Sequence, residues 1–77
     1  MREFDIVLRS LYQVQDFVKL AMIQPFDILV GNDRQHINGK DLMGMFCLDF
    51  SEPQKVRMIC TQEEFLSFRT SAKAFLA

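Results

Sequence analysis

Few groups in this chain could carry acid/base or nucleophilic chemistry: the clearest are one histidine, two cysteines and a pair of adjacent glutamates. His36 lacks the motif context that Ser-His-Asp catalysis requires. Glu63 and Glu64 are neighbours that point to different sides of a helix, so they cannot act as an acid/base pair on one bond. We therefore predict that the protein is not an enzyme.

The two cysteines do not indicate a metal or redox site. Cys47 and Cys60 form no CxxC pair, and no Cys/His cluster has metal-ligand spacing. The three glycines form neither a GxGxxG loop nor a P-loop. We expect no metal and no cofactor. We predict two reduced thiols in a cytosolic core, because free cysteine is usually buried, with a disulfide as the alternative.

The charge balance favours a protein or a small molecule as the partner. Nine Lys+Arg stand against ten Asp+Glu, which gives a formal charge of -1. Nucleic-acid-binding domains usually carry a basic surplus gathered in a stripe, so we expect no nucleic acid. We expect no signal peptide, and the chain has no apolar run near the ~18 residues of a membrane-spanning helix. We expect a cytoplasmic protein that makes no membrane contact.

These residues must be positioned by one domain, residues 1–77, because the chain is too short for two. Alternation of apolar and polar residues predicts four strands, over residues 3–8, 26–30, 34–37 and 55–60. Residues 31–33, Gly-Asn-Asp, tolerate positive φ and predict a hairpin turn. The sheet face with Asp5, Asp27 and Arg57 is expected to contact solvent.

Three helices are predicted between and after these strands, over about residues 11–22, 42–48 and 61–76. Before the first, Ser10 and Gln13 have the form of a capping box, in which the Gln13 side chain reaches back to the N–H of Ser10. Asp41 is a good N-cap for the second. The third begins with another capping box, at residues 61–64.

Helical spacing of apolar residues predicts which sides of the first and third helices are buried. The first stripe is Leu11, Val14, Val18 and Ala21, and the other is Phe65, Phe68, Ala72 and Phe75. The element order is β-α-β-β-α-β-α, which indicates an α+β domain with these two helices on one face of the sheet.

This order and several segments resemble the HPr family, the histidine-containing phosphocarriers of the sugar phosphotransferase system. Residues 17–21 are similar to the middle of the family's first helix. Residues 27–44 fit its second strand, hairpin and Lys-Ser-Ile-Met-Gly segment without a gap, and residues 56–60 fit its last strand. The resemblance covers nearly the whole chain. It implies an open-faced β-sandwich, with a four-stranded antiparallel sheet and helices on one face.

The start of the first helix departs from the family. HPr begins that helix with His-Ala-Arg-Pro, and its histidine receives phosphate from enzyme I and passes it to a sugar permease. Here the matching residues are Ser10, Leu11, Tyr12 and Gln13, and Arg9 is the only nearby base. Seryl and tyrosyl phosphate esters are poor phosphoryl donors, so we expect the phosphorylatable histidine to be lost. His36 falls on the hairpin, where we expect a surface histidine.

Two further positions gain meaning from the resemblance. Asp41 stands where many HPr proteins carry a serine that a kinase phosphorylates, so it could imitate phosphoserine in part while also capping the helix. Leu42, Met43 and Phe46 occupy the family's apolar docking patch, and Phe17 is a further candidate for it. The alternative is that Leu42, Met43 and Phe46 face inward and hold a short helix down, and that Phe17 packs in the core.

The hypothesis from the sequence is an HPr-like protein-binding or regulatory module without the active histidine. Its partner would be a phosphotransferase-system component or a transcriptional regulator. One alternative is a working phosphocarrier that uses Ser10 or a histidine elsewhere. The other is an unrelated small α+β subunit. The sequence does not define the oligomeric state.

Overall fold

The computed structural model describes residues 1–77. The elements are β1 (Arg2–Ile6), α1 (Leu11–Met22), β2 (Ile28–Gly31), β3 (His36–Asn38), α2 (Leu42–Met45), β4 (Gln54–Met58), α3 (Gln62–Ser71) and a 3-10 turn, Lys73–Phe75. This is the predicted element order. None of the helices is long and apolar enough to cross a membrane.

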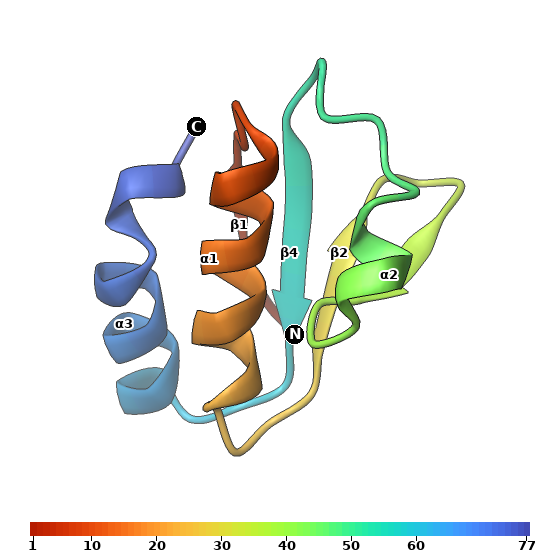
Figure 1. Ribbon diagram of the computed structural model, residues 1–77. Coiled ribbons are helices and arrows are strands. Elements are labelled where there is room, and N and C mark those ends of the chain that lie inside the picture. Colours follow the sequence, from red (N-terminus) through yellow and green to blue (C-terminus); the bar gives the residue numbers. More distant parts are fainter.

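The four strands form one antiparallel sheet in the order β1-β4-β2-β3. α1 and α3 cover one face of the sheet, and α2 lies beside α1 near β3 (Figure 1). The opposite face is open. Strand β4 therefore lies between β1 and β2 and binds both, although it is the last strand in the chain.

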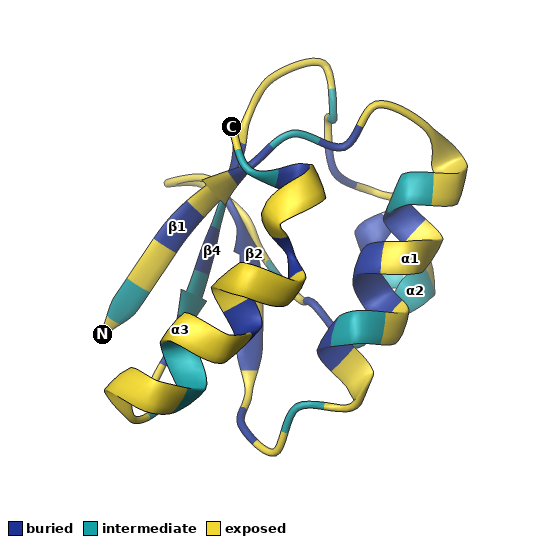
Figure 2. Ribbon diagram, turned by 90° about the vertical axis from the view of Figure 1, so that its left-hand side faces the viewer, coloured by how far each residue is buried: buried dark blue, intermediate teal, exposed yellow.

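Side-chain burial follows the predicted alternation along the strands, and Figure 2 shows the bands of buried and exposed residues on β1. The inward-facing pairs are Phe4 and Ile6, Ile28 and Val30, and Val56 and Met58. They pack against the buried side of α1, which consists of Val14, Phe17, Val18 and Ala21. Leu11 is an exception to the predicted stripe: it is 68% exposed, because the first turn of α1 has no covering element on that side.

Several element ends differ from the predictions for identifiable reasons. β1 leaves β4 after Ile6, because the N–H of Val7 bonds to the carbonyl oxygen of Phe75 instead. β4 ends at Met58, where the pairing with both neighbouring strands stops. α2 is shorter than predicted because the N–H groups of Cys47 and Leu48 bond three residues back rather than four.

An aromatic cluster joins the helices to the sheet. The ring of Phe68 on α3 lies 5.7 Å from that of Phe4, 6.1 Å from that of Phe17 and 5.9 Å from that of Phe26, measured between centroids. Phe68 is fully buried. It therefore contacts β1, α1 and the segment before β2 at once.

We predict that Phe68→Ala lowers the free energy of unfolding by about 3–5 kcal/mol, because the lost ring leaves a cavity that several elements cannot jointly fill. Urea denaturation followed by circular dichroism measures this. Leu66→Ala, at a half-exposed site on the same helix, is the control and should cost less than about 1 kcal/mol. Equal effects of the two substitutions would contradict the central place of Phe68.

The β2–β3 hairpin requires a glycine at position 31. A Cβ there would lie 1.8 Å from the backbone carbonyl oxygen of Gln35, a group that accepts the N–H of Asn32 and cannot move independently. We predict that Gly31→Ala destabilises the protein by about 1–3 kcal/mol or more. Thermal unfolding tests this against Asp33→Ala in the same turn, which should stay within about 0.5 kcal/mol of wild type. A Gly31→Ala protein as stable as wild type would refute the close approach.

Candidate functional site

The start of α1 is closed by its own side chains. Ser10 Oγ accepts a hydrogen bond from the backbone N–H of Gln13 at 3.1 Å. Gln13 Oε1 accepts one from the N–H of Arg9 at 2.6 Å. The sequence predicted that Gln13 would instead accept from the N–H of Ser10. Because the backbone of Ser10 is extended, the N–H of Arg9 is the group that Gln13 Oε1 reaches. The N–H of Gln13, one of the free donors of the helix N-terminus, is thus already satisfied, as is the N–H of Arg9 just before the helix.

A hollow of about 530 Å³ opens beside this cap. Its walls are largely apolar, and Arg9 is the only cation among the lining residues, which are Val7, Leu8, Arg9, Ser10, Leu11, Val14, Phe50 and Ser51. Leu11 and Tyr12 project into solvent at its rim. The hollow therefore offers one positive charge and an apolar wall, but no imidazole.

Gln54 anchors the loop that forms the far wall of this hollow. Its side chain is buried at the start of β4, and its amide nitrogen donates to the carbonyl oxygens of Asp49 and Glu52. The sequence analysis overlooked Gln54. Its place two residues before Val56 and four before Met58 was the available signal, because alternate residues of a strand share a face.

The same loop contains a short polar turn. Ser51 donates to Asp49 Oδ1 twice, through its hydroxyl at 2.6 Å and its backbone N–H at 2.9 Å. These bonds, the hydroxyl first, lower the pKa of Asp49 below its ordinary value of 3.8. The turn presents the neighbouring Phe50 to the hollow.

Asp41 holds the N-cap position of α2, as predicted, but its side chain makes no capping hydrogen bond. The carboxylate lies against the helix instead, since a Cβ on Gly44 would be 2.9 Å from Asp41 Oδ2. That Cβ would also be 2.9 Å from Ile37 Cγ2, so the glycine lets α2 approach β3 closely. The carboxylate of Asp41 has no ion-pair partner within 4.0 Å. Its charge is therefore available at the surface.

A second hollow, of about 590 Å³, runs between α1 and α2. Lys40 Nζ donates to the carbonyl oxygen of Gln24 at 2.8 Å and ties the segment before α2 to the end of α1. The two helices present exposed methionines here, Met22 and Met43, and Met43 is 74% exposed. The walls are Gln15, Val18, Lys19, Met22, Lys40, Asp41, Leu42 and Met43.

The predicted docking residues fall into two groups. Met43 and Phe46 are exposed, and Leu42 is half-buried against the core. Phe17 is fully buried and contacts the rings of Phe68 and Phe75, 6.1 Å away in each case. Its predicted place in the docking patch is therefore wrong, because the inner side of α1 faces the sheet. We call Leu11, Tyr12, Met22, Met43 and Phe46 the helical surface.

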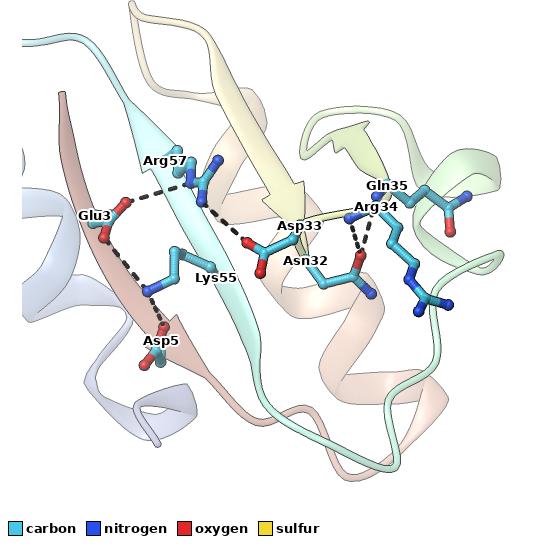
Figure 3. A network of polar contacts seen from close by, with 8 residues as sticks. All are labelled: Glu3, Asp5, Asn32, Asp33, Arg34, Gln35, Lys55 and Arg57. Carbon is cyan, nitrogen blue, oxygen red and sulfur yellow. Dashed lines mark hydrogen bonds and ion pairs between the residues drawn. The ribbon is translucent and has the colours of Figure 1, made fainter.

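His36 lies away from the start of α1. It is exposed on β3 and pairs with Gly31, which pairs with Lys55 in the next strand. Lys55 contacts Asp5 on the open face of the sheet (Figure 3). Side chains in register across neighbouring strands share a face, so His36 is on the side opposite α1.

The two free cysteines differ in their exposure to solvent. Cys47 is exposed just after α2 and Cys60 is half-buried beyond β4, and both are free thiols. Exposure of Cys47 contradicts the prediction that both are core residues. Burial raises the pKa of the Cys60 thiol, and the nearby Glu64 carboxylate raises it further. Cys60 is thus a poor nucleophile.

The architecture matches a solved structure, the crystal structure of HPr-C-His from Thermoanaerobacter tengcongensis. The two superpose with a TM-score of 0.73 and 23% sequence identity, over 94% of this chain and 90% of that one. The chain has the HPr fold. No protein-family model and no curated protein sequence matches it.

The HPr fold confirms the α+β class, the four-stranded antiparallel open sheet and the helices on one face that the resemblance implied. In this member of the fold, the first helix begins with Ser10 and Leu11 rather than with an imidazole. Leu11 and Tyr12 lie in the first turn of α1 and Met22 is its last residue, so the helical surface includes residues from both ends of this helix. The capped helix start and three of the exposed apolar residues, Leu11, Tyr12 and Met22, are thus carried by the same helix.

Sequence reasoning missed part of the helical surface. Met22 was placed at the end of the first helix without a role, and Leu11 was assigned to the core. Leu11 lies seven residues before the buried Val18, and Met22 lies four residues after it. At the ends of a helix, such spacing does not distinguish a buried side chain from an exposed one. Only the positions of α2 and the sheet decide it.

We predict that Ser51→Ala raises the pKa of Asp49 toward 3.8, because the hydroxyl donor is removed, while the backbone N–H still holds the pKa somewhat below that value. In the wild type, Asp49 favours the folded state above its ordinary pKa, and this contribution is lost as the pH falls through the lowered value. A carboxyl-carbon NMR titration of both proteins measures the shift. An unchanged pKa in the variant would show that the hydroxyl does not bond to Asp49.

Proposed function

We propose that the protein is an HPr-like binding module that recognises a protein partner through the helical surface and does not carry phosphate. The partner would be a phosphotransferase-system component or a transcriptional regulator in the cytoplasm. The observation that carries the proposal is the capped, imidazole-free start of α1 beside exposed apolar residues of α1 and α2.

The chemistry of α1's first turn supports the absence of phosphoryl transfer. A phosphocarrier needs a nucleophile whose phosphorylated form is itself a good donor, and a histidine nitrogen meets both conditions. The Ser10 hydroxyl meets neither well, and it accepts the hydrogen bond that starts the helix. A phosphate on Ser10 would have to displace this cap or accept the same N–H.

The exposed side chains support protein recognition instead. Leu11, Met22, Met43 and Phe46 are large apolar groups that are exposed on or directly after α1 and α2. Gathered apolar side chains of this kind mark sites of association, and methionine adapts to partners of different shape. Lys40 holds α2 against the end of α1, so the surface is formed before a partner arrives.

Asp41 supports a regulatory role at the same site. Its carboxylate is exposed, unpaired and next to Leu42 and Met43. It therefore presents a permanent negative charge where a phosphorylated serine would present a switchable one. A partner that reads this charge would bind the protein in all metabolic conditions.

The test is capture of partners from a cell extract of the source organism. We predict that Met43→Asp and Phe46→Asp each reduce the captured partner at least about tenfold, because each places a charge in a desolvated contact. Asp41→Asn should reduce capture less. The matched control is Leu66→Asp on α3, which should capture as much as wild type.

Circular dichroism must show that all four variants are folded. Retention of the partner by both Met43→Asp and Phe46→Asp would place the interface elsewhere and refute the proposal. Equal loss with Leu66→Asp would show that the added charge acts generally and not through the helical surface.

A further inference from the structure

Strand β1 forms one edge of the sheet, and part of this edge is already paired with residues 75–77, which we call the tail. The N–H of Val7 donates to the carbonyl oxygen of Phe75 at 2.7 Å, and the N–H of Ala77 donates to that of Asp5 at 3.0 Å. The tail runs antiparallel to β1 on the side away from β4. It therefore acts as a short added strand.

The next stretch of the same edge has free backbone groups. Successive residues of a strand direct their N–H and C=O groups to opposite sides, so those of Glu3 point the same way as those of Asp5, away from β4. The backbone of Glu3 takes part in none of the hydrogen bonds that lie outside the helices and strands. No element lies in front of β1 in Figure 2. Glu3 thus presents one donor and one acceptor to solvent.

The other edge of the sheet is short and covered. Strand β3 has three residues, and α2 packs beside it. The carbonyl oxygen of Asn38 on this strand accepts the N–H of Asp41 at 2.9 Å. Short strands and covering elements are common ways to prevent pairing at an edge. The β1 edge has neither protection at Glu3.

Charged side chains also protect sheet edges, but those of β1 are directed along the open face (Figure 3). Lys55 Nζ lies 3.4 Å from Glu3 Oε1 and 3.4 Å from Asp5 Oδ1. Arg57 Nε lies 3.3 Å from Glu3 Oε2. Both carboxylates are therefore paired with cations of β4 and do not extend beyond the edge.

On the inner side of the edge, apolar groups can receive a further side chain. Leu76 of the tail lies opposite Ile6 and packs against the core. Two residues further along β1, the ring of Phe4 lies 6.0 Å from that of Phe65, measured between centroids, and Phe65 is half-buried. A side chain opposite Phe4 would cover Phe65 as Leu76 covers the core.

We propose that the free edge of β1 binds an extended segment of a partner protein as a further antiparallel strand, in line with the tail. The residue opposite Glu3 would exchange two backbone hydrogen bonds with it. The residue opposite Phe4 would be apolar and would contact Phe65. In such complexes the backbone bonds give affinity and the side-chain contacts give selectivity. The site is distinct from α2, which lies near the opposite edge of the sheet.

A second copy of this chain fits the same edge less well. Two β1 strands could pair antiparallel through Glu3 in three registers. Glu3 would lie opposite Glu3 or Asp5 of the other copy, or Arg2 would lie opposite the other Arg2. Like charges directly opposite each other destabilise a strand pair. A segment with uncharged residues at these positions has no such conflict.

The probe is the blocked peptide acetyl-Thr-Leu-Thr-Leu-Thr-amide, titrated into the ¹⁵N-labelled full chain. In the proposed complex its threonine N–H groups face β1 and its leucine N–H groups face solvent. We expect the peptide to shift the amide signals of Glu3 and Asp5 but not that of Met43. N-methylation of the threonines should abolish these shifts, whereas N-methylation of the leucines should leave them unchanged.

Substitutions at Glu3 then test the backbone contact. Glu3→Pro removes the edge N–H without touching the pairing with β4, a place where sheets tolerate proline, and should weaken peptide binding about tenfold or more. Glu3→Ala loses the same carboxylate but keeps the N–H, so it should bind within about twofold of wild type. Met43→Asp on the helical surface should bind as the wild type does, which separates this proposal from the proposed function.

Three results would overturn the proposal. One is peptide binding that does not depend on which residues are methylated, or no binding by the unmodified peptide, measured on the wild type, where no variant has to fold. Another is unchanged affinity in a Glu3→Pro protein that circular dichroism shows to be folded. The third is self-association of the protein alone that the peptide disrupts, measured by analytical ultracentrifugation, because the occupant would then be a second copy.

Discussion

The contact on which the rest of the structure depends is the burial of the Phe68 ring against Phe4, Phe17 and Phe26. A chain of this length buries only about 60% of its unfolded surface, so few contacts are available to fix its helices. Phe68 attaches α3 to α1 and to the sheet together. It thereby sets where α1 lies on the sheet, and that position brings its first turn beside the loop held by Gln54.

From this arrangement two surfaces of different chemistry follow. On the helical side, the first turn of α1 is capped internally and the apolar side chains of α1 and α2 contact solvent. On the open side, ion pairs engage both cations of β4, and a hollow beside them is lined by Met1, Leu29 and Ile59 together with Asp27 and Arg57. The two faces of the HPr fold thus differ in chemistry in this chain.

Much of the fold could be predicted from the sequence because local patterns specify it. The bounds of α1 agree because Ser10 and Pro25 limit it, and the capping box at Thr61 and Glu64 forms as predicted. Local patterns failed where long-range packing decides. Phe17 was left as a candidate for either the docking patch or the core, and Leu11 was expected in the core, because helical spacing does not reveal where the sheet ends. Gln54 was overlooked because its role is to donate hydrogen bonds to two carbonyl oxygens of a loop, and no sequence pattern reveals those contacts.

The central proposal is that this protein does not accept and transfer phosphate, because the start of α1 has a capping hydroxyl and no imidazole. Incubation of the protein with phosphoenolpyruvate and enzyme I, followed by ³¹P NMR, tests this most directly, with an active HPr as the positive control. The account predicts no phosphorus signal attached to the protein while the control becomes phosphorylated. An acid-labile phosphate on this chain, on His36 or any other residue, would contradict it.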